Sequence, residues 1–248
     1  MAKNNKGDWP EEGEGYLEIS DKGFGFLRSP GNRFQSKPSD IFVTPDPIRR
    51  HYLREGCFIK GRLVPPHKGH SPQLREIFSV NEMPFKEYTE CSRFENLTTI
   101  DPLDKFNLET DPDIIETRVI DLVTPIGKGT RGLIVAPPRT GKTTVLKQIC
   151  NAVTTNHPEV KTIVMLIDER PEEVTDFERS VDAEVVASSN DMDLETHVRL
   201  SRFMIERCRR MVECGQDVFV LMDSITRIAR AYNNVKGGSG RTMSGGVD

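Results

Sequence analysis

The sequence predicts a small all-β barrel followed by a partial α/β core built on a parallel sheet. Short runs of alternating apolar residues fill the first third of the 248 residues. Longer apolar strands alternating with helical patterns fill the rest, which indicates a parallel sheet. The stretch APPRTGKT, residues 136–143, lies between a predicted strand and a predicted helix, as a phosphate-binding loop requires.

The composition is that of an ordinary globular protein, with 36% hydrophobic and 29% charged residues. No apolar run approaches the roughly 18 residues that indicate a membrane span, and the polar start lacks the apolar core of a signal peptide. Five dispersed cysteines without a C-x-x-C pair favour reduced thiols, so we expect a cytoplasmic protein.

The net charge of −4 is unevenly distributed. Residues 14–83 hold 11 Lys/Arg against 8 Asp/Glu, whereas residues 84–248 hold 21 against 27. Any nucleic acid is therefore expected to bind the N-terminal third.

The N-terminal part divides into a polar tail over residues 1–13, which we expect to be disordered, and a barrel over residues 14–83. Five short β patterns separated by turn residues predict a small barrel or sandwich, with one helix inside it that begins near a proline. The strands are expected at 15–19, 25–27, 40–43, 58–64 and 76–80, and the helix at 45–53.

Residues 84–115 mix prolines and acids with little periodicity and are interpreted as a linker. The α/β core is expected over residues 116–248. Its strands are predicted at 132–136, 162–167, 184–187 and 217–222, and its helices at 142–155, 172–180, 193–213 and 224–232.

The phosphate-loop interpretation depends on four consecutive residues, Gly141, Lys142, Thr143 and Thr144. In such a loop, backbone N–H groups at a helix N-terminus surround a phosphate, lysine adds positive charge, and a hydroxyl ligates Mg²⁺. Ala136 stands where the pattern has its first glycine. The alternative is an ordinary strand–turn–helix with a surface lysine, which the flanking elements make less favourable.

Acidic residues follow two of the apolar strands. Asp223 is expected to hold the Mg²⁺, or alternatively to cap the next helix. Glu169 is our candidate for activating the attacking water, with Asp168 as the second choice. Glu172 and Glu173 are assigned to the first turn of the following helix. Together with the loop, these acids predict nucleoside triphosphate hydrolysis.

The stretch KGFGFLR places Phe24 and Phe26 two residues apart, so both rings share one face of a strand. Exposed rings on a basic barrel can stack the bases of single-stranded nucleic acid. The alternative is that both rings belong to the barrel core. The nearby charges of Lys22, Arg28 and Asp40 favour the surface interpretation.

These motifs closely resemble those of the bacterial Rho transcription termination family, whose members are ring-shaped hexameric ATP-dependent RNA translocases. The resemblance covers residues 15–248 and rests on GYLEISDKGFGFLRSP, DIFVTPDPIRR, FENLTTIDP, DLVTPIGKGTRGLIVAPPRTGKT, LIDERPEEVTDFER, AEVVASS, LMDSITRIARAYN and GRTMSGGVD. An alanine at position 136 is usual in that family.

The resemblance implies a cold-shock/OB-like RNA-binding barrel before a RecA-like P-loop ATPase core. It implies as partners C-rich single-stranded RNA, a homo-hexamer and the RNA polymerase elongation complex, and as cofactors ATP and Mg²⁺. The implied RNA-binding residues are Gly23, Phe24, Gly25, Phe26, Leu27, Arg28, Asp40, Ile41 and Phe42, with Arg241 and Thr242 in a channel loop. The implied nucleotide-binding residues are Gly127, Lys128, Gly129, Thr130, Arg131, Gly132, Arg139, Thr140, Gly141, Lys142, Thr143, Thr144 and Arg170. The implied catalytic residues are Glu169, Lys142 and Asp223, and the implied metal ligands are Thr143 and Asp223.

Two departures from the family bear on function. Leu74 stands near the usual position of a stacking tyrosine, and the sequence stops where the family continues, so we expect a C-terminally truncated fragment. Two alternatives stay open. One is a module that binds RNA and ATP without turnover, and the other is a rotary-ATPase-like subunit, against which GFGF on a basic barrel argues.

Overall fold

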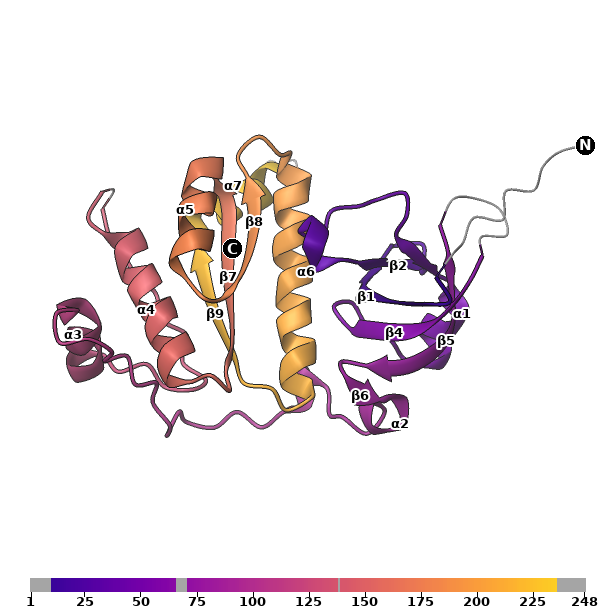
Figure 1. Ribbon diagram of the computed structural model, residues 1–248, viewed down its shortest axis with the longest axis horizontal. Coiled ribbons are helices and arrows are strands. Elements are labelled where there is room, and N and C mark those ends of the chain that lie inside the picture. Colours follow the sequence, from indigo (N-terminus) through magenta and orange to yellow (C-terminus); the bar gives the residue numbers. More distant parts are fainter. Residues whose placement is uncertain (1–9, 66–70, 138, 236–248) are drawn as a thin grey trace, which may run out of the picture. The chain divides into compact units, whose positions relative to one another are not determined.

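The computed structural model describes residues 10–65, 71–137 and 139–235. The chain divides into two compact units (Figure 1). The barrel unit comprises residues 1–95 together with Arg202–Gly215, and the nucleotide unit comprises Asn96–Ser201 together with Gln216–Asp248. No helix among the described residues has the length and apolarity that a membrane crossing needs.

The barrel unit is a closed sheet, which decides for the barrel over the sandwich that five short strands also allow. Its strands run in the order β3-β2-β1-β4-β5-β6, and a parallel pairing of Phe42 with Gln73 joins β3 to β5. The strands are β1 (Glu12–Ile19), β2 (Gly25–Arg28), β3 (Ile41–Val43), β4 (Phe58–Val64), β5 (Gln73–Val80) and β6 (Met83–Pro84), and α1 (Pro45–Arg50) follows β3.

Alternation along β4 shows how the sequence builds this barrel. Ile59, Gly61 and Leu63 are buried while the charged residues between them are exposed, so one face of the strand packs in the core. Gly61 is required there, because a Cβ at this position would stand 2.0 Å from the carbonyl oxygen of Glu76. Leu74 also belongs to the core, with 3% of its surface exposed.

The position of Leu74 corrects the expectation that it stands in for a surface aromatic. Because successive side chains of a strand alternate between faces, Gln73 and Arg75 flank Leu74 on the outer face, where Gln73 is half-buried and Arg75 is exposed. Gln73 is also the residue that pairs with Phe42.

The last part of α6 (Leu194–Glu213) packs within the barrel unit. The rings of Phe34 and Phe203 lie 5.4 Å apart, and the guanidinium of Arg207 lies 4.2 Å from the centroid of the Tyr16 ring. Both carboxylate oxygens of Glu213 accept hydrogen bonds from Arg54, one of them at 2.7 Å. This part of α6 is therefore an integral element of the barrel unit.

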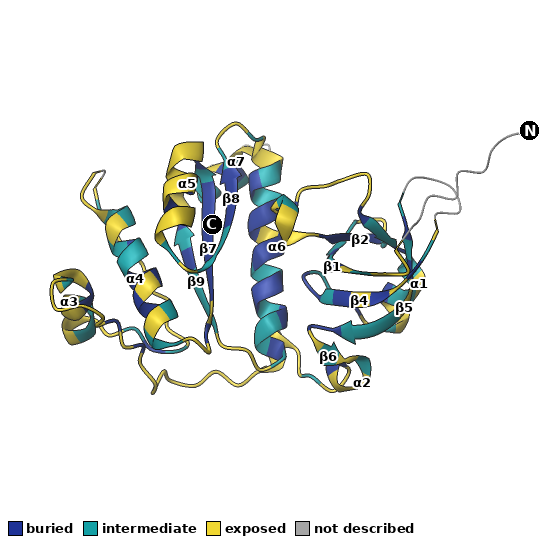
Figure 2. Cartoon of the chain, viewed as in Figure 1, coloured by how far each residue is buried: buried dark blue, intermediate teal, exposed yellow. Residues whose placement is uncertain are grey.

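The nucleotide unit contains a three-stranded parallel sheet in the order β8-β7-β9, as the alternating pattern predicts. The strands are β7 (Lys161–Glu169), β8 (Glu184–Ser189) and β9 (Val218–Asp223). Its helices include α3 (Ile115–Val123), α4 (Lys142–Asn156), α5 (Pro171–Ser180) and α7 (Ile225–Val235). Figure 2 shows β7 as the most buried element of this sheet, in line with its six consecutive buried residues.

The expected strand at residues 132–136 is wrong. This segment is irregular, and Leu133 and Val135 expose 71% and 84% of their surfaces. A strand needs a neighbour for its backbone groups, and no described strand pairs with this one. The run of apolar residues indicated a buried strand, but an apolar run does not show whether a neighbouring strand is there to pair with it.

Short elements also occur between the barrel and the sheet, where the sequence predicted a linker. They are α2 (Phe85–Tyr88) and the 3₁₀ turn η2 (Phe94–Asn96), followed by irregular chain up to α3. Phe106 and Leu108 of this stretch are buried in the core of the nucleotide unit.

Candidate functional site

The phosphate loop ends at Gly141, which takes a left-handed conformation with φ of 90° immediately before α4. A side chain is strained in that conformation, and no heavy atom lies within 4 Å of the position that a Cβ would take. Lys142 is the first residue of α4, and Thr143 beside it is half-buried. Open space therefore adjoins the first turn of a helix, whose free N–H groups favour an anion.

The Lys142 ammonium donates a hydrogen bond to the Asp223 carboxylate, which is 7% exposed. Asp223 ends β9, and its position next to α4 brings a base and an acid together from distant parts of the sequence. This pair joins the two residues that were predicted to bind phosphate and metal.

Glu169 ends β7 and is buried, with 5% of its surface exposed. Arg227 Nη2 donates a hydrogen bond of 3.2 Å to Glu169 Oε2. Burial, followed by a hydrogen bond with Glu173, raises the pKa of Glu169 to about 7, although the charge of Arg227 opposes the rise. This carboxyl group therefore titrates near neutral pH, where a general base is most effective.

Arg227 is a residue of this site that the sequence did not single out. Besides contacting Glu169, it donates a hydrogen bond to the backbone carbonyl of Asp168, and its Nη1 lies 3.7 Å from Asp168 Oδ2. Asp168 takes a left-handed φ of 59°, and His197 Nε2 lies 3.9 Å from its carboxylate. An arginine in the first turn of the helix after Asp223 was the available signal.

Thr143 and Asp223 fit a magnesium ion, because a hydroxyl and a carboxylate are hard oxygen donors. Among the described residues, no group of three His, Cys, Asp or Glu side chains could hold a metal without outside ligands. An ion at this edge would therefore take its remaining ligands from phosphate and water.

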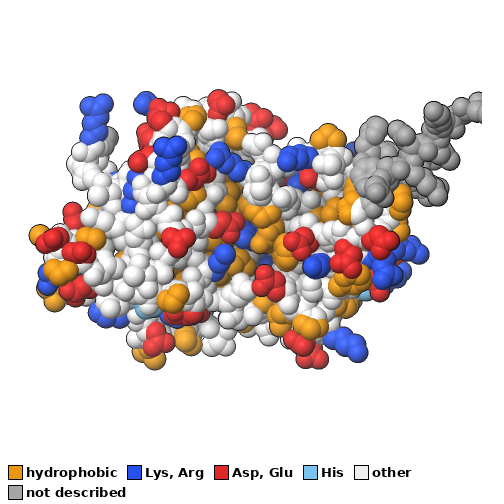
Figure 3. Space-filling view, in the orientation of Figure 1, with side chains coloured by type: hydrophobic (Ala, Val, Ile, Leu, Met, Phe, Trp, Pro, Cys, Tyr) orange, Lys and Arg blue, Asp and Glu red, His pale blue; other side chains and the backbone are white. Residues whose placement is uncertain are grey.

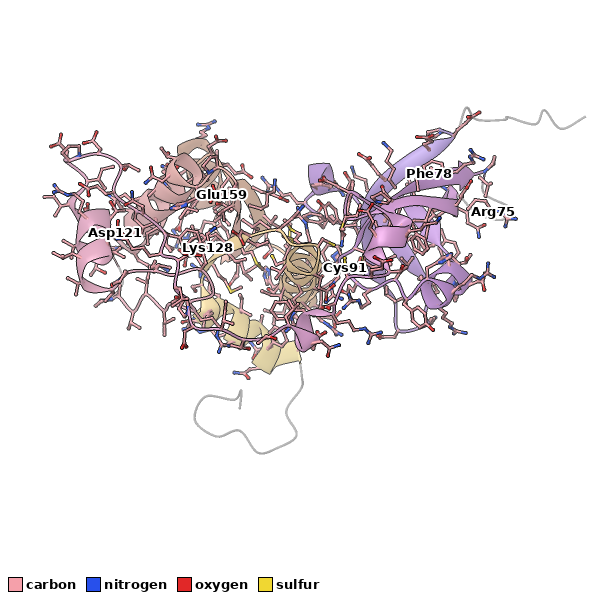
Figure 4. All side chains as sticks on the ribbon, turned by 90° about the horizontal axis from the view of Figure 1, so that it is seen from below. Arg75, Phe78, Cys91, Asp121, Lys128 and Glu159 are labelled. Carbon is pink, nitrogen blue, oxygen red and sulfur yellow. The ribbon has the colours of Figure 1, made fainter. Side chains whose placement is uncertain are left out.

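Part of the predicted nucleotide loop lies elsewhere in the unit. Lys128 Nζ donates a hydrogen bond of 2.5 Å to Asp217 and lies 3.6 Å from Glu159, which is labelled with it in Figure 4. Asp217 precedes β9 whereas Asp223 ends it, so roughly 20 Å of strand separates the two edges, at about 3.3 Å per residue. Lys128 and its neighbour Gly127 are thus not brought to the phosphate loop.

The remaining predicted nucleotide contacts share one property, which is that their surfaces are exposed. They are Gly129, Thr130, Arg131, Gly132, Arg139, Thr140, Thr144 and Arg170. Arg139 has a positive φ of 63°, and Arg170 caps α5 by accepting backbone hydrogen bonds from Glu173 and Val174.

In the barrel unit, Phe24, Phe26 and Phe42 form a cluster of three aromatic rings, here called the aromatic cluster. Their centroids lie 5.8, 5.6 and 5.5 Å apart, and all three side chains are half-buried. None of them belongs to the buried core of the barrel, so the core alternative for Phe24 and Phe26 does not hold. Three adjoining, half-buried rings offer a surface on which flat ligands can stack.

Arg28 and Asp40 lie under this cluster and not on its surface, since each is 8% exposed. Arg28 donates hydrogen bonds to Asp40, to Glu18 at 2.5 Å and to Ser36 at 3.1 Å, and its guanidinium lies 5.0 Å from the centroid of the Phe26 ring. Buried charges need partners, and these two provide one another. Their geometry suits positioning of the rings more than direct contact with a ligand.

The other predicted residues of this region divide between surface and core. Gly23, Ile41 and the cluster rings are partly exposed, whereas Gly25 and Leu27 are buried. Arg241 and Thr242 lie outside the described residues. Figure 3 shows acidic and basic side chains interspersed over the visible face of each unit, in keeping with the small net charge.

Family models match both parts of the chain. Residues 13–86 match the Rho termination factor RNA-binding domain, and residues 116–245 match the nucleotide-binding domain of the ATP synthase alpha/beta family.

Curated relatives match the chain through both units. The chain is 47% identical to "Transcription termination factor Rho" of Chromobacterium violaceum over 95% of its own length and 57% of the relative's. It is 46% identical to the protein of the same name from Pseudomonas aeruginosa, over all of this chain and 60% of that one. The chain thus spans somewhat more than half the length of these relatives.

Among solved structures, the assembled ATPase EscN of the type III secretion system of enteropathogenic E. coli is similar, with a TM-score of 0.50 and 25% identity. The match covers 61% of this chain and 36% of EscN. A partial RecA-like core is therefore shared with ATPases of the secretion and rotary class.

Proposed function

This chain belongs to the family of transcription termination factor Rho, and from that premise we propose that it is an RNA-dependent ATPase of transcription termination. In this proposal, the barrel binds nascent single-stranded RNA, and ATP hydrolysis in the nucleotide unit drives its release from RNA polymerase. The observation that carries the proposal is the charged edge formed by Lys142, Asp223, Glu169 and Arg227, in a chain that also carries an RNA-binding barrel.

RNA binding is assigned to the aromatic cluster. Bases stack on accessible ring faces, and each such contact contributes about 1–3 kcal/mol. The buried pair of Arg28 and Asp40 fixes the rings from below, because it anchors β2 to the loop before β3. We propose Gln73 as a further contact, since it pairs with Phe42 and its amide can both donate to and accept from a base edge. A preference for C-rich RNA belongs to the same proposal.

ATP hydrolysis is assigned to the carboxyl edge of the parallel sheet. The first turn of α4 and Lys142 would hold the phosphates, because both present positive charge to the same open space. Ionised Glu169 would take a proton from the attacking water, whose oxygen forms a bond to the γ-phosphorus as ADP leaves. Arg227 would orient Glu169 by its 3.2 Å hydrogen bond.

Magnesium is proposed as the cofactor at Thr143 and Asp223. When bound, it neutralises developing charge on the phosphate oxygens. Asp223 hydrogen-bonds to Lys142, so we infer that this pair opens when nucleotide and metal enter. Lys142 would then turn to the phosphate, and the Asp223 carboxylate would turn to the metal or its water shell.

Assembly and location complete the proposal. We propose a homo-hexamer that acts on the RNA polymerase elongation complex, on the grounds that the curated relatives bear the name of the termination factor and that EscN is described as an assembled ATPase. A cytoplasmic location is proposed because all five cysteines are free thiols.

The test is an ATPase assay of the protein with and without oligo(C) RNA. Stimulation of phosphate release by RNA supports the proposed motor. RNA binding without turnover would favour a module that only binds its two ligands, and turnover unaffected by RNA would favour a relative of the rotary ATPases. A Glu169→Gln variant, which keeps the shape of the side chain, controls for contaminating ATPases.

A further inference from the structure

Two half-buried cysteines, Cys91 and Cys214, meet in the barrel unit although about 120 residues separate them in the chain. Cys91 follows α2, and Cys214 follows Glu213, the last residue of α6. Neither takes part in the proposed RNA or nucleotide chemistry, and Cys91 is labelled in Figure 4.

The hairpin formed by β5 and β6 contacts both thiols. Asn81 in the turn of this hairpin donates a hydrogen bond of 3.3 Å to Cys214 Sγ, and Cys91 Sγ donates one of 3.9 Å to Met83 Sδ. Asn81 is itself fixed, because its Oδ1 accepts a 2.8 Å hydrogen bond from the backbone of Phe58. Cys91 also lies close enough to Cys214 to contribute to the raised pKa of the Cys214 thiol.

Contacts on the other side of Cys91 hold the same two segments together. The backbone N–H of Phe94 donates a 2.7 Å hydrogen bond to the buried carboxylate of Glu213. The guanidinium of Arg209 lies 5.5 Å from the centroid of the Phe94 ring. The chain around Cys91 is thus fastened to the end of α6 both before and after the thiol, so both cysteines lie where these two segments meet.

We propose that Cys91 and Cys214 are a modification site, a dithiol that closes to an intramolecular disulfide when a two-electron oxidant is present. With the diazene reagent diamide, two S–H bonds break and one S–S bond forms. The two protons and two electrons pass to the N=N bond of diamide, which becomes a hydrazine.

The other three cysteines are poor competitors because they are buried. Cys57 and Cys150 are fully buried and Cys208 is 8% exposed. Burial raises the pKa of the Cys57 thiol, and it raises that of Cys150 to about 12. A thiol must ionise and be reached by the oxidant before it reacts, so burial disfavours all three residues and the raised pKa further disfavours Cys57 and Cys150.

Burial, together with the neighbouring Cys91, also raises the pKa of the Cys214 thiol. Formation of the disulfide is therefore expected to be several-fold faster near pH 9 than near pH 7, since more of this thiol is ionised.

The experiment treats the reduced protein with diamide, blocks the remaining thiols with iodoacetamide, and maps the peptides by mass spectrometry. We expect a single cross-linked peptide pair containing Cys91 and Cys214, with the other three cysteines alkylated. Closing a loop of this size is expected to raise the midpoint of thermal unfolding by about 5 °C or more, reversibly with dithiothreitol.

Cys91→Ser and Cys214→Ser should each abolish both the cross-link and the thermal shift, while Cys150→Ala in the other unit should leave both unchanged. Alkylation of all five thiols after diamide, cross-links that involve Cys57, or dimers joined through Cys91 would overturn the proposal. Because the peptide map is read on the unaltered protein, the test does not depend on the variants folding.

Discussion

The aromatic cluster of the barrel draws its three rings from residues 24–42, whereas the charged edge of the sheet gathers Lys142, Glu169, Asp223 and Arg227 from separate elements. The rings are held by neighbouring strands, since Phe26 pairs with Phe42 across β2 and β3. The charges are held by one another, through the ion pairs of Lys142 with Asp223 and of Arg227 with Glu169.

The two surfaces differ in whether a protein contact must break before a ligand can bind. The aromatic cluster keeps its rings accessible, so bases can stack without displacing a protein contact. At the charged edge, the ammonium of Lys142 hydrogen-bonds to a carboxylate, and phosphate must replace that partner. In the proposed function the barrel surface is thus preformed, while the charged edge would exchange the Lys142–Asp223 ion pair for ligand contacts. Substitutions at one surface should therefore impair one ligand and spare the other.

Lys142→Ala gives the largest expected effect. Removing the ammonium leaves the phosphates without their positive partner, so ATP turnover should fall by about 10³-fold, the upper range for one electrostatic group in an active site. Oligo(C) affinity, measured by fluorescence anisotropy, should not change, because the aromatic cluster lies in the barrel unit. A loss of RNA binding equal to the loss of turnover would show that the two surfaces are not separable.

The double substitution Phe24→Ala with Phe26→Ala should have the reverse selectivity. Each lost stack costs about 1–3 kcal/mol, so RNA affinity should fall by roughly 100-fold or more while ATP binding persists. Phe78→Ala is a matched control, because this half-buried ring on β5 lies beside Arg62 and outside the aromatic cluster. Equal losses in the double variant and in the control would contradict the assignment.

The pH dependence of turnover tests whether Glu169 acts as the base at the charged edge. The Glu169 carboxyl has a pKa of about 7 and must be ionised to accept a proton, so the rate should rise about tenfold between pH 6 and pH 8. The stability effect has the opposite sign. Because the pKa is higher in the folded state than in the unfolded state, the Glu169 carboxyl makes a contribution to stability that is lost as pH rises through about 7.

Steady-state rates at saturating ATP and RNA check the first statement, and thermal midpoints from about pH 4.5 to pH 8, the range between the unfolded and folded pKa and just above it, check the second. Replacing Glu169 with Gln should abolish turnover at every pH and should remove this component of the stability profile. A rate that is flat from pH 6 to pH 8 would contradict the role of Glu169 as the base.

The sequence predicted the elements whose determinants are local. Alternation over residues 58–64 matches β4 (Phe58–Val64), and the expected helix at 142–155 matches α4 (Lys142–Asn156) closely. It failed at residues 132–136, because a strand requires a partner that periodicity does not reveal. Arg227 was missed for a related reason, since its pairing with Glu169 depends on how β7 and α7 meet in space.

For the candidate RNA surface, the sequence indicated the residues but not their depth. Charged side chains near two aromatic rings correctly indicated that the rings are not core, yet Arg28 and Asp40 are themselves buried as a pair. The spacing of Arg28 and Asp40 in the sequence does not reveal that the two charges pair with each other and can therefore be buried. The pairing register of a strand determines which of its residues face outward. In β5, the register places Leu74 in the core and pairs Gln73 with Phe42, so Gln73 is the candidate for contact with RNA.

Gln73→Ala therefore tests the smallest expected effect, a loss of about two- to fivefold in oligo(C) affinity from one hydrogen-bonding side chain. Leu74→Ala is its contrast, because truncating a buried leucine should lower the free energy of unfolding by about 2–5 kcal/mol. The protein that remains folded should bind RNA normally. Anisotropy titrations combined with urea unfolding separate the two outcomes. The opposite result would be weaker RNA binding by Leu74→Ala, at a urea concentration where this variant is fully folded, with no loss for Gln73→Ala. Gln73 on the outer face of β5 would then have no part in RNA binding. Stacking on β2 and β3 alone would account for the affinity.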